Sequence, residues 1–205
     1  MSMKWLEWAQ QIQAISQSGL AYSKDVYDIE RFKELRNISA EIVAEYSNKN
    51  LDDVKKVFIN EEGYQTPKVD VRAVIFREDK ILLVKEKSDN KWTLPGGWAD
   101  IGISPSQNAV KEVEEESGYI VTPKRLLAVL DRNMHGHTPN IHHSYKLFIE
   151  CILVGGEPKT SVETSDVGFF SADSLPPLSI ERVTEDQIKR MFEYNGMEHI
   201  EVWFD

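Results

Sequence analysis

The sequence predicts an α+β protein: an α/β/α sandwich around a mixed β-sheet, preceded by a small all-helical domain. Three observations support this prediction. Apolar residues recur at helical spacing through residues 1–66, strand-like runs begin at Val69, and two amphipathic helical segments interrupt and close those runs. We therefore expect a helical domain over residues 1–66 and a larger, sheet-containing domain over residues 67–205.

The N-terminal domain is expected to contain three helices and no catalytic residue. The first ends at Gly19, the second runs from about Lys24 to Tyr46, and a short third begins near Asn48 or Asn50. The side chains that mark one face of the first helix are Trp5, Trp8, Ala9, Ile12 and Ile15. Those expected to point inward on the second are Val26, Ile29, Phe32, Leu35, Ile38, Ile42 and Tyr46.

Surplus apolar surface in this domain predicts a homodimer. Residues 1–66 carry tryptophan, tyrosine and aliphatic side chains in helical stripes, and so small a unit cannot bury every stripe within itself. The remaining face could pack on the second domain or, as we predict, on a second copy of the chain related by two-fold symmetry. Residues 61–68 have the Gly, Pro and polar composition of a linker, which permits either arrangement.

The second domain is expected to begin with a β-hairpin and to end with a helix. The hairpin pairs residues 69–76 with residues 81–87 around a turn. Further strands are expected at residues 91–94, 125–132, 144–154 and 167–170, with a Pro-Gly-Gly turn at 95–97 and a closing helix at 184–194. This order of strands and helices predicts a mixed sheet between helical layers.

The central stretch of the chain is a predicted helix between Ser104 and Gly118. Ser104 precedes Pro105 and is suited to cap the N-terminus of the helix, and Gly118 is suited to end it. The residues expected in the buried stripe of this helix are Ala109, Val110 and Val113.

Three glutamates stand on this helix at positions i, i+3 and i+4. They are Glu112, Glu115 and Glu116, and we expect their carboxylates to project from one face. Like charges at this spacing repel, and a divalent cation would remove the repulsion. Carboxylate oxygens are the ligands that magnesium and manganese prefer, especially where phosphates supply further oxygens. From the glutamates alone, the alternative is an acidic face that is simply solvated.

The stretch 97–119 resembles the signature of the Nudix hydrolases. In that signature a Gly opens the segment, a Glu and later an Arg-Glu pair follow, and Glu-Glu precedes a closing Gly. Here Gly97 and Gly118 stand 21 positions apart (118 − 97), as the family requires. Ile103 and Lys111 replace the family's first Glu and its Arg, which pair with each other in the family. Losing both partners together costs less than losing one.

The resemblance implies a fold, a reaction and a cofactor. It implies a Nudix-like sandwich that hydrolyses the diphosphate bridge of a nucleoside diphosphate linked to a group X, for example CDP-choline or ADP-ribose. The products would be a nucleoside monophosphate and phospho-X, and the cofactor would be magnesium or manganese. The helical N-terminal region followed by this domain resembles the subgroup of nucleoside diphosphate-linked-X hydrolases, which is often dimeric.

The resemblance also suggests roles for individual residues. Glu112 and Glu116, one helical turn apart, are the first choice as metal ligands, and Glu115 is a further candidate. Glu115 or Glu163 is the candidate general base, although Glu163 could also lie in a plain solvated loop. The Gly96–Gly97 backbone could approach a ligand or only shape the turn. The candidates for contact with a substrate phosphate are Arg72 and either Lys85 or Lys87. The histidine cluster His135, His137, His142 and His143 could contact a phosphate or leaving group. The alternative for both sets is a solvated strand or loop position.

Composition limits the partners and the location. The net charge of −10 argues against a nucleic-acid polymer as partner, which calls for a basic face, but not against a small nucleotide. The single cysteine, Cys151, excludes an intramolecular disulfide and favours a reducing cytoplasm. The sequence contains no apolar run of membrane-spanning length and no recognisable signal peptide, so we expect no membrane partner.

Two other functions stay open on the sequence alone. A Nudix-like domain that binds a nucleotide as a sensor, without hydrolysing it, would be consistent with Ile103 and Lys111. A structural module that binds a partner protein would rely on the N-terminal helices. An assay for phosphate-containing products with a panel of nucleotides separates hydrolysis from both alternatives.

Overall fold

The computed structural model describes residues 4–59 and 61–205, which divide into two compact units. The first unit contains the described residues up to Pro67 together with Pro139–His143, and the second contains Lys68–Thr138 and Ser144–Asp205. The helices and the mixed sheet confirm the predicted α+β class. The sequence did not predict that Pro139–His143 folds with the N-terminal helices.

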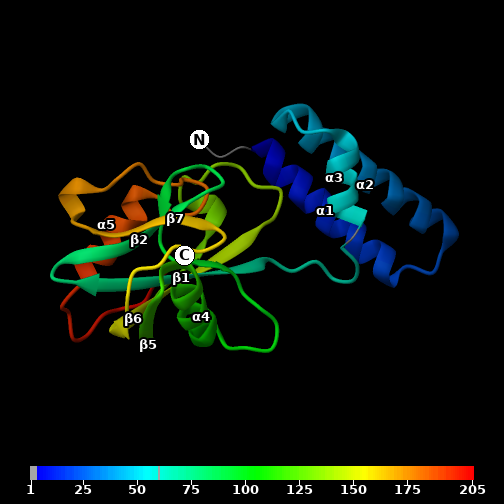
Figure 1. The fold of residues 1–205 in the computed structure, drawn as a ribbon. Helices are drawn as coiled ribbons and strands as arrows, with labels where there is room; N and C mark the ends of the chain where they lie inside the picture. Colours follow the sequence, from blue (N-terminus) through cyan, green and yellow to red (C-terminus); the bar gives the residue numbers. More distant parts are fainter. Residues whose placement is uncertain (1–3, 60) are drawn as a thin grey trace. The chain divides into compact units, whose positions relative to one another are not determined.

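The first unit is built from helices α1 (Lys4–Tyr22), α2 (Val26–Ser47) and α3 (Leu51–Ile59) (Figure 1). Asp25 caps α2, because its carboxylate accepts hydrogen bonds from the backbone N–H groups of Tyr27 and Asp28. Asn48 ends α2 in the left-handed conformation. The Asn50 side chain accepts from the backbone at the start of α3, as the sequence suggested.

Gly19 lies inside α1, so the prediction that it ends the helix was wrong. A Cβ atom at Gly19 would lie 2.5 Å from ring carbons of Phe32 in α2. The missing side chain therefore lets α1 and α2 approach closely at this point. The helix continues to Tyr22 because this glycine serves packing between helices.

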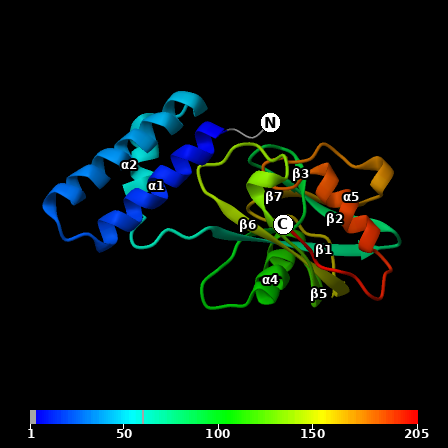
Figure 2. The same cartoon turned by 180° about the vertical axis from the view of Figure 1, so that it is seen from behind.

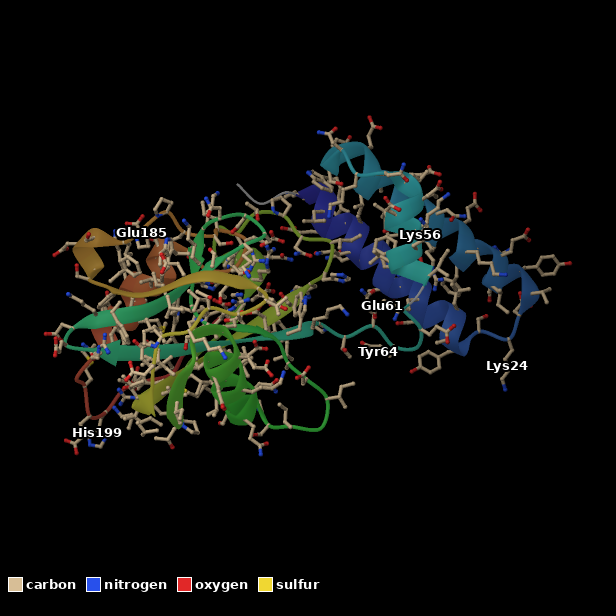
Figure 3. The ribbon with its side chains drawn as sticks, viewed as in Figure 1. Lys24, Lys56, Glu61, Tyr64, Glu185 and His199 are labelled. Carbon is tan, nitrogen blue, oxygen red and sulfur yellow. The ribbon has the colours of Figure 1, made fainter. Side chains whose placement is uncertain are left out.

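The apolar side chains of α1 and α2 face outward more than predicted. Trp8 and Ile15, which belong to the predicted apolar face of the first helix, are each 59% exposed. Others from the predicted buried faces that are exposed are Val26, Leu35, Ile38 and Tyr46. Side chains such as Lys24, Lys56 and Tyr64 also project outward from the ribbon of this unit (Figure 3). Helical periodicity therefore identified the apolar stripes without identifying what covers them.

The interior of the first unit mixes small apolar and polar groups. Its core consists of Ala9, Ala40, Val43, Val54 and Phe58. The buried polar residues are Gln13, Ser16, Gln17 and Ser39. The Ser39 hydroxyl donates a 2.7 Å hydrogen bond to the backbone carbonyl of Ala9, which ties α2 to α1.

The segment Pro139–His143 completes this unit. The side chain of Gln10 donates a 3.0 Å hydrogen bond to the carbonyl oxygen of Asn140. Ile141 packs against the core of the unit. These contacts explain why the segment belongs with helices that precede it by more than a hundred residues.

The second unit contains a mixed sheet in the order β3-β2-β1-β6-β5-β8, with β4 paired to β1 and β7 paired to β2. The strands are β1 (Lys68–Arg77), β2 (Lys80–Glu86), β3 (Trp92–Thr93), β4 (Gly96–Trp98), β5 (Tyr119–Asp131), β6 (Ser144–Gly156), β7 (Thr164–Phe170) and β8 (Trp203–Phe204). β1 pairs with β6 and β5 with β8 in parallel, and the other pairs are antiparallel. The predicted β1–β2 hairpin is confirmed, and its turn residues Glu78 and Asp79 both have positive φ.

Two helices cover opposite sides of these strands (Figures 1 and 2). α4 (Pro105–Ser117) buries Ala109 and Val113 against one face of the sheet. α5 (Glu185–Tyr194) buries Ile188 and Met191 against the other face. The α/β/α layering predicted for this part of the chain is therefore present.

Several strand boundaries differ from the predicted ones. Gly96–Trp98 forms β4 where a turn was expected, because glycine lets this backbone lie against β1. β5 begins at Tyr119, and β6 extends through Gly156, since the two strands pair along almost their whole length. β8 is too short to leave a sequence pattern. No helix in the described ranges is both long and apolar enough to cross a membrane.

Candidate active site

Helix α4 is fixed at both ends as the sequence predicted. The Ser104 hydroxyl accepts from the Gln107 backbone N–H, and the Gln107 side chain accepts from the Ser104 backbone N–H. Gly118 ends the helix with φ of 74°. These caps set the rotation and extent of the helix that carries the glutamates.

Glu116 is bound to the backbone of β4. Its Oε2 atom accepts a 2.9 Å hydrogen bond from the Gly96 N–H, and the side chain is almost fully buried. Gly96 has φ of 142°, and a Cβ atom there would lie 2.0 Å from the carbonyl oxygen of Val71. Only glycine fits this position, so Gly96 both forms the strand pair and presents its N–H to Glu116.

Glu112 lies beside the next glycine. A Cβ atom at Gly97 would lie 3.2 Å from Oε1 of Glu112, which is tighter than ordinary contact. The absence of a side chain at Gly97 therefore keeps space open next to this carboxylate. The structure thus places the predicted Gly96–Gly97 backbone against the two predicted metal ligands.

Burial raises the pKa of both carboxyl groups. The pKa of Glu116 is raised to about 8, mainly by burial and further by the charges of Glu112 and Glu86, against the opposing effects of Arg72 and the Gly96 hydrogen bond. Burial likewise raises the pKa of Glu112 above its ordinary value, with contributions from Glu115 and Glu163. Two crowded, desolvated carboxylates favour either a proton or a cation.

The chemistry of this pair fits magnesium or manganese. Carboxylate oxygens are hard ligands, and Mg²⁺ commonly uses one or two of them together with water and substrate phosphates. No cluster of three or more acidic, histidine or cysteine side chains converges on one point within residues 4–59 and 61–205. Glu112 and Glu116 would therefore hold the cation together with oxygens from outside the protein.

Glu115 lies in a different environment from Glu112 and Glu116. It is exposed, and its Oε2 atom lies 3.1 Å from Nζ of Lys111. Lys111 also contacts Asp100 at 2.9 Å, and the hydrogen bonds to both carboxylates raise the pKa of its ammonium. Lys111, which stands where the Nudix signature has Arg, thus pairs with two neighbouring carboxylates, and Ile103 is partly exposed in the loop before the helix.

Glu163 lies in a loop that is tied to β2. Its carbonyl oxygen accepts from the backbone N–H of Lys87, whose ammonium donates to the carbonyl oxygens of Ser161 and Val162. The charge of Glu163 acts on Glu112. The structure therefore brings Glu163 into the electrostatic surroundings of the α4 carboxylates.

Arg72 is buried behind the site instead of being open to a phosphate. Its Nε and Nη2 atoms each donate a 2.8 Å hydrogen bond to Asp70, and Nη1 donates to the carbonyl oxygen of Leu94. These bonds use three of the five N–H donors of Arg72, and the side chain is only 4% exposed, so a substrate phosphate has little access to it. Its charge nevertheless acts on Glu116 from within the protein.

His142 and His143 belong to the first unit, whereas the carboxylates belong to the second. The backbone N–H of His142 donates to the side chain of Asn140 in the same segment. A contact between these histidines and the substrate stays a prediction.

Sequence reasoning missed Glu86 and Asp70. Glu86 is buried, forms an ion pair with Arg182, and contributes to the raised pKa of Glu116. Asp70 is buried between Arg72 and Lys146. One signal was available for Asp70: a charge two positions from Arg72 on an apolar strand must lie on the same face of that strand.

The fold and the carboxylate pair fit the class of hydrolases that act on phosphate groups with a divalent cation. Sequence comparison supports that class. Residues 66–192 match the family model of the NUDIX domain, and residues 3–58 match that of the UDP-X-like, N-terminal oligomerisation domain. The chain belongs to the Nudix family, and the predicted activity class of pyrophosphohydrolase is confirmed.

Two curated relatives illustrate this similarity. A putative ADP-ribose pyrophosphatase, YjhB, from Bacillus subtilis (strain 168) is 52% identical over 191 residues, covering 93% of this chain and 92% of the relative. The ADP-ribose pyrophosphatase of Methanocaldococcus jannaschii is 33% identical over 134 residues, covering 62% of this chain and 76% of the relative.

Solved structures give the same result. The crystal structure of a UDP-X diphosphatase is 35% identical, with a TM-score of 0.64, and the match covers 100% of this chain and 99% of that one. The structure of an ADP-ribose pyrophosphatase from Streptococcus suis is 47% identical, with a TM-score of 0.63, covering 68% of this chain and all of that one.

Proposed function

We propose that this protein hydrolyses the diphosphate bridge of a nucleoside diphosphate linked to a group X, using Glu112 and Glu116 to hold a divalent cation. The observation that carries the proposal is the carboxylate pair against the Gly96–Gly97 backbone, in which Glu116 is buried and Glu112 is half-buried. When bound, the cation would neutralise the bridge oxygens and make an attacking water easier to deprotonate.

The protein's own groups position the carboxylate that would hold the cation and supply a general base for the attacking water. The Gly96 N–H holds one oxygen of Glu116 and leaves the other for the cation. Because burial raises the pKa of Glu116 to about 8, cation binding displaces a proton near neutral pH. Glu163 is the better candidate for general base, since the carboxylate of Glu115 is bound by Lys111.

The substrate class includes ADP-ribose, CDP-choline and UDP-linked sugars. The names of the relatives support ADP-ribose and UDP-linked compounds for those proteins. For this chain we propose ADP-ribose as the first substrate to test, with CDP-choline and a UDP-sugar beside it.

A product assay tests the proposal. The protein is incubated with each compound and with magnesium, manganese or a chelator, and the products are identified by chromatography and ³¹P NMR. We expect a nucleoside monophosphate and phospho-X only when a cation is present. Binding of a compound without cleavage under every condition would instead support a nucleotide sensor.

The homodimer is a separate proposal. The match to an oligomerisation domain supports assembly through residues 3–58, and the exposed Trp8 and Ile15 side chains supply apolar surface there. Light scattering coupled to size-exclusion chromatography at micromolar concentration tests it. About twice 23.6 kDa is expected, and a mass near 23.6 kDa would refute the dimer.

A cytoplasmic location and the lack of nucleic-acid and membrane partners stay predictions. The free Cys151 thiol is buried, and burial raises its pKa to about 12, so it is a poor nucleophile in any compartment. Fractionation of cells that express the full chain would test the location.

A further inference from the structure

A buried polar cluster lies behind the carboxylate pair in the second unit. Lys146 on β6 stands opposite Asp70 on β1, and its ammonium donates a 2.7 Å hydrogen bond to the Asp70 carboxylate. Asp70 also accepts both hydrogen bonds from Arg72, whose charge acts on Glu116. Through Arg72 the cluster acts electrostatically on one of the proposed metal ligands.

The positive charge in this cluster exceeds the negative charge beside it. Asp70 is one carboxylate shared by two cations, Arg72 and Lys146. Lys146 is only 1% exposed, and of its three N–H donors one is used within the described residues. Burial lowers the pKa of this lysine to about 8 despite Asp70. A buried ammonium with unused donors is costly unless acceptor atoms complete its shell.

Two further buried side-chain atoms of the second unit, one on Ser144 and one on His137, have no hydrogen-bond partner. Ser144 is fully buried on the same face of β6 as Lys146, and its hydroxyl is unpaired. The Nε2 atom of His137 is also buried without a partner. His137 and Arg132 bond to the backbone carbonyl oxygens of the adjacent residues Ile180 and Glu181. The charges of Lys146, Arg132 and Asp70 act on this imidazole.

The protonation of His137 follows from its other nitrogen. Nδ1 lies 2.7 Å from the carbonyl oxygen of Ile180, and a carbonyl can only accept, so Nδ1 carries the hydrogen. Burial lowers the pKa of His137 to about 4, so the ring is neutral near pH 7. Nε2 is then an acceptor that needs a donor. The cluster as a whole therefore offers donors from Lys146 and Ser144 beside one acceptor.

We propose that His137, Ser144 and Lys146 recognise a substrate group in which an acceptor oxygen stands beside an O–H or N–H donor. Two parts of a nucleoside diphosphate linked to X carry this chemistry: a pair of sugar hydroxyls and the imide edge of uracil. This inference rests on the proposed function, because it assigns these residues to the substrate of the same site.

Three full-length variants isolate the proposed contacts. Ser144→Ala removes the hydroxyl from a space that alanine fits. His137→Asn keeps a side-chain N–H near the Nδ1 position, for Ile180, but removes the Nε2 acceptor, whereas His137→Gln keeps a polar atom near Nε2. Ser171→Ala is the matched control, because Ser171 makes no side-chain cap hydrogen bond in its turn. Circular dichroism and thermal unfolding verify that each variant folds.

Isothermal titration calorimetry with the two halves of a substrate, as they occur in the products, measures binding to the site without relying on turnover. The probes are UMP, CMP, AMP and ribose 5-phosphate. We expect Ser144→Ala and His137→Asn to weaken binding by ~5–50-fold, with His137→Gln closer to the unmodified protein and Ser171→Ala unchanged. A loss of affinity for UMP alone identifies the uracil imide as the recognised group. An equal loss of affinity for all four probes identifies the sugar hydroxyls. Unchanged affinities for every probe would overturn the proposal and leave a bound water as the occupant.

Kinetics then separate this inference from the proposed function. In a substrate that is cleaved, loss of a recognition contact raises KM by a similar factor while kcat changes little. If no compound in the panel is cleaved, the proposed function fails, and the calorimetric comparison still decides whether the cluster binds its ligand.

Discussion

The two units depart from the usual distribution of polar and apolar residues in opposite ways. In the first unit, Trp8 and Ile15 are exposed while Gln13 is buried. In the second unit, two apolar core clusters are present, and charged residues such as Asp70 and Lys146 are buried as well. Buried charge needs specific partners, and exposed apolar surface needs a cover. The proposals made above account for each departure: another protein surface would cover the first unit, and a small polar ligand would meet the buried charges of the second.

The largest effect on stability is expected from Asp70→Asn, which leaves Arg72 and Lys146 without their shared carboxylate. We expect a loss of about 3–5 kcal/mol in the free energy of unfolding. The matched change in the first unit is Asp28→Asn, which removes an exposed pair with Arg31 and should cost less than about 1 kcal/mol. Urea denaturation measures both. Similar losses for the two variants would show that the buried network does not stabilise the second unit.

The largest effect on activity is expected from Glu116→Gln. The amide oxygen can still accept from the Gly96 N–H, but the ligand charge is lost. Turnover should fall ~10²–10³-fold, with the fold intact. The control is Glu114→Gln, two positions before Glu116 on the exposed side of α4, which should keep near-normal turnover. Near-normal turnover in Glu116→Gln would remove Glu116 from the proposed ligands.

The pH dependence of stability sharpens the account of the second unit. The pKa of Glu116 is about 8 in the folded protein against an ordinary value of 4.5. Between these values the unfolded chain releases the proton and the folded chain keeps it, so metal-free stability should fall as pH rises from 4.5 to 8. Glu112 contributes with the same sign.

Urea denaturation at pH 5 and pH 8 with a chelator measures this fall. We expect a decrease of at least about 1 kcal/mol that becomes smaller in Glu116→Gln. Magnesium at pH 8 should restore stability in the unmodified protein and less so in the variant. An identical pH profile in both proteins would contradict the assignment of the raised pKa to Glu116.

Ile15→Glu tests whether a second copy of the chain covers the exposed apolar face of the first unit. Because Ile15 is 59% exposed, the change should alter the unfolding free energy of the subunit by only about 0.5 kcal/mol. If this face lies in the proposed dimer, the mass measured by light scattering should halve. Gln11→Glu is a second test, because it adds the same charge one helical turn away on the same exposed face and should also halve the mass. Dimers in both variants would place the interface elsewhere.

The smallest effect is expected from Ile103→Glu. Ile103 is partly exposed before α4, and Lys111 already has two carboxylate partners. Stability should change by less than about 0.5 kcal/mol and the rate by less than about twofold. A loss above about 2 kcal/mol would show that Ile103 packs as a core residue.

Local features of the active-site helix could be predicted from sequence because their causes are local. Ser104, Pro105 and Gly118 act through backbone groups within one turn of themselves, and the spacing of Glu112 and Glu116 fixes their common face. The partner of Lys111 was also within reach of such reasoning, since Glu115 stands four positions along the helix.

Features that depend on distant pairing could not be predicted in this way. The Asp70–Lys146 pair arises from the parallel register of β1 and β6. The exposure of Trp8 arises because a helical stripe is equally consistent with an internal core and with a surface that another molecule covers. Gly19 was misread because glycine can end a helix or admit a neighbouring ring.

The membership of Pro139–His143 in the first unit has a consequence for exchange of modules between proteins of this family. The core of the first unit includes Ile141, and α1 binds the backbone of Asn140 through Gln10. A recombination that imported a foreign N-terminal segment by one crossover near Pro67 would leave this five-residue insert behind, matched to helices that are no longer present. Successful chimaeras should therefore carry two inherited pieces, the N-terminal helices and the β5–β6 connection, which are expected to change together during evolution.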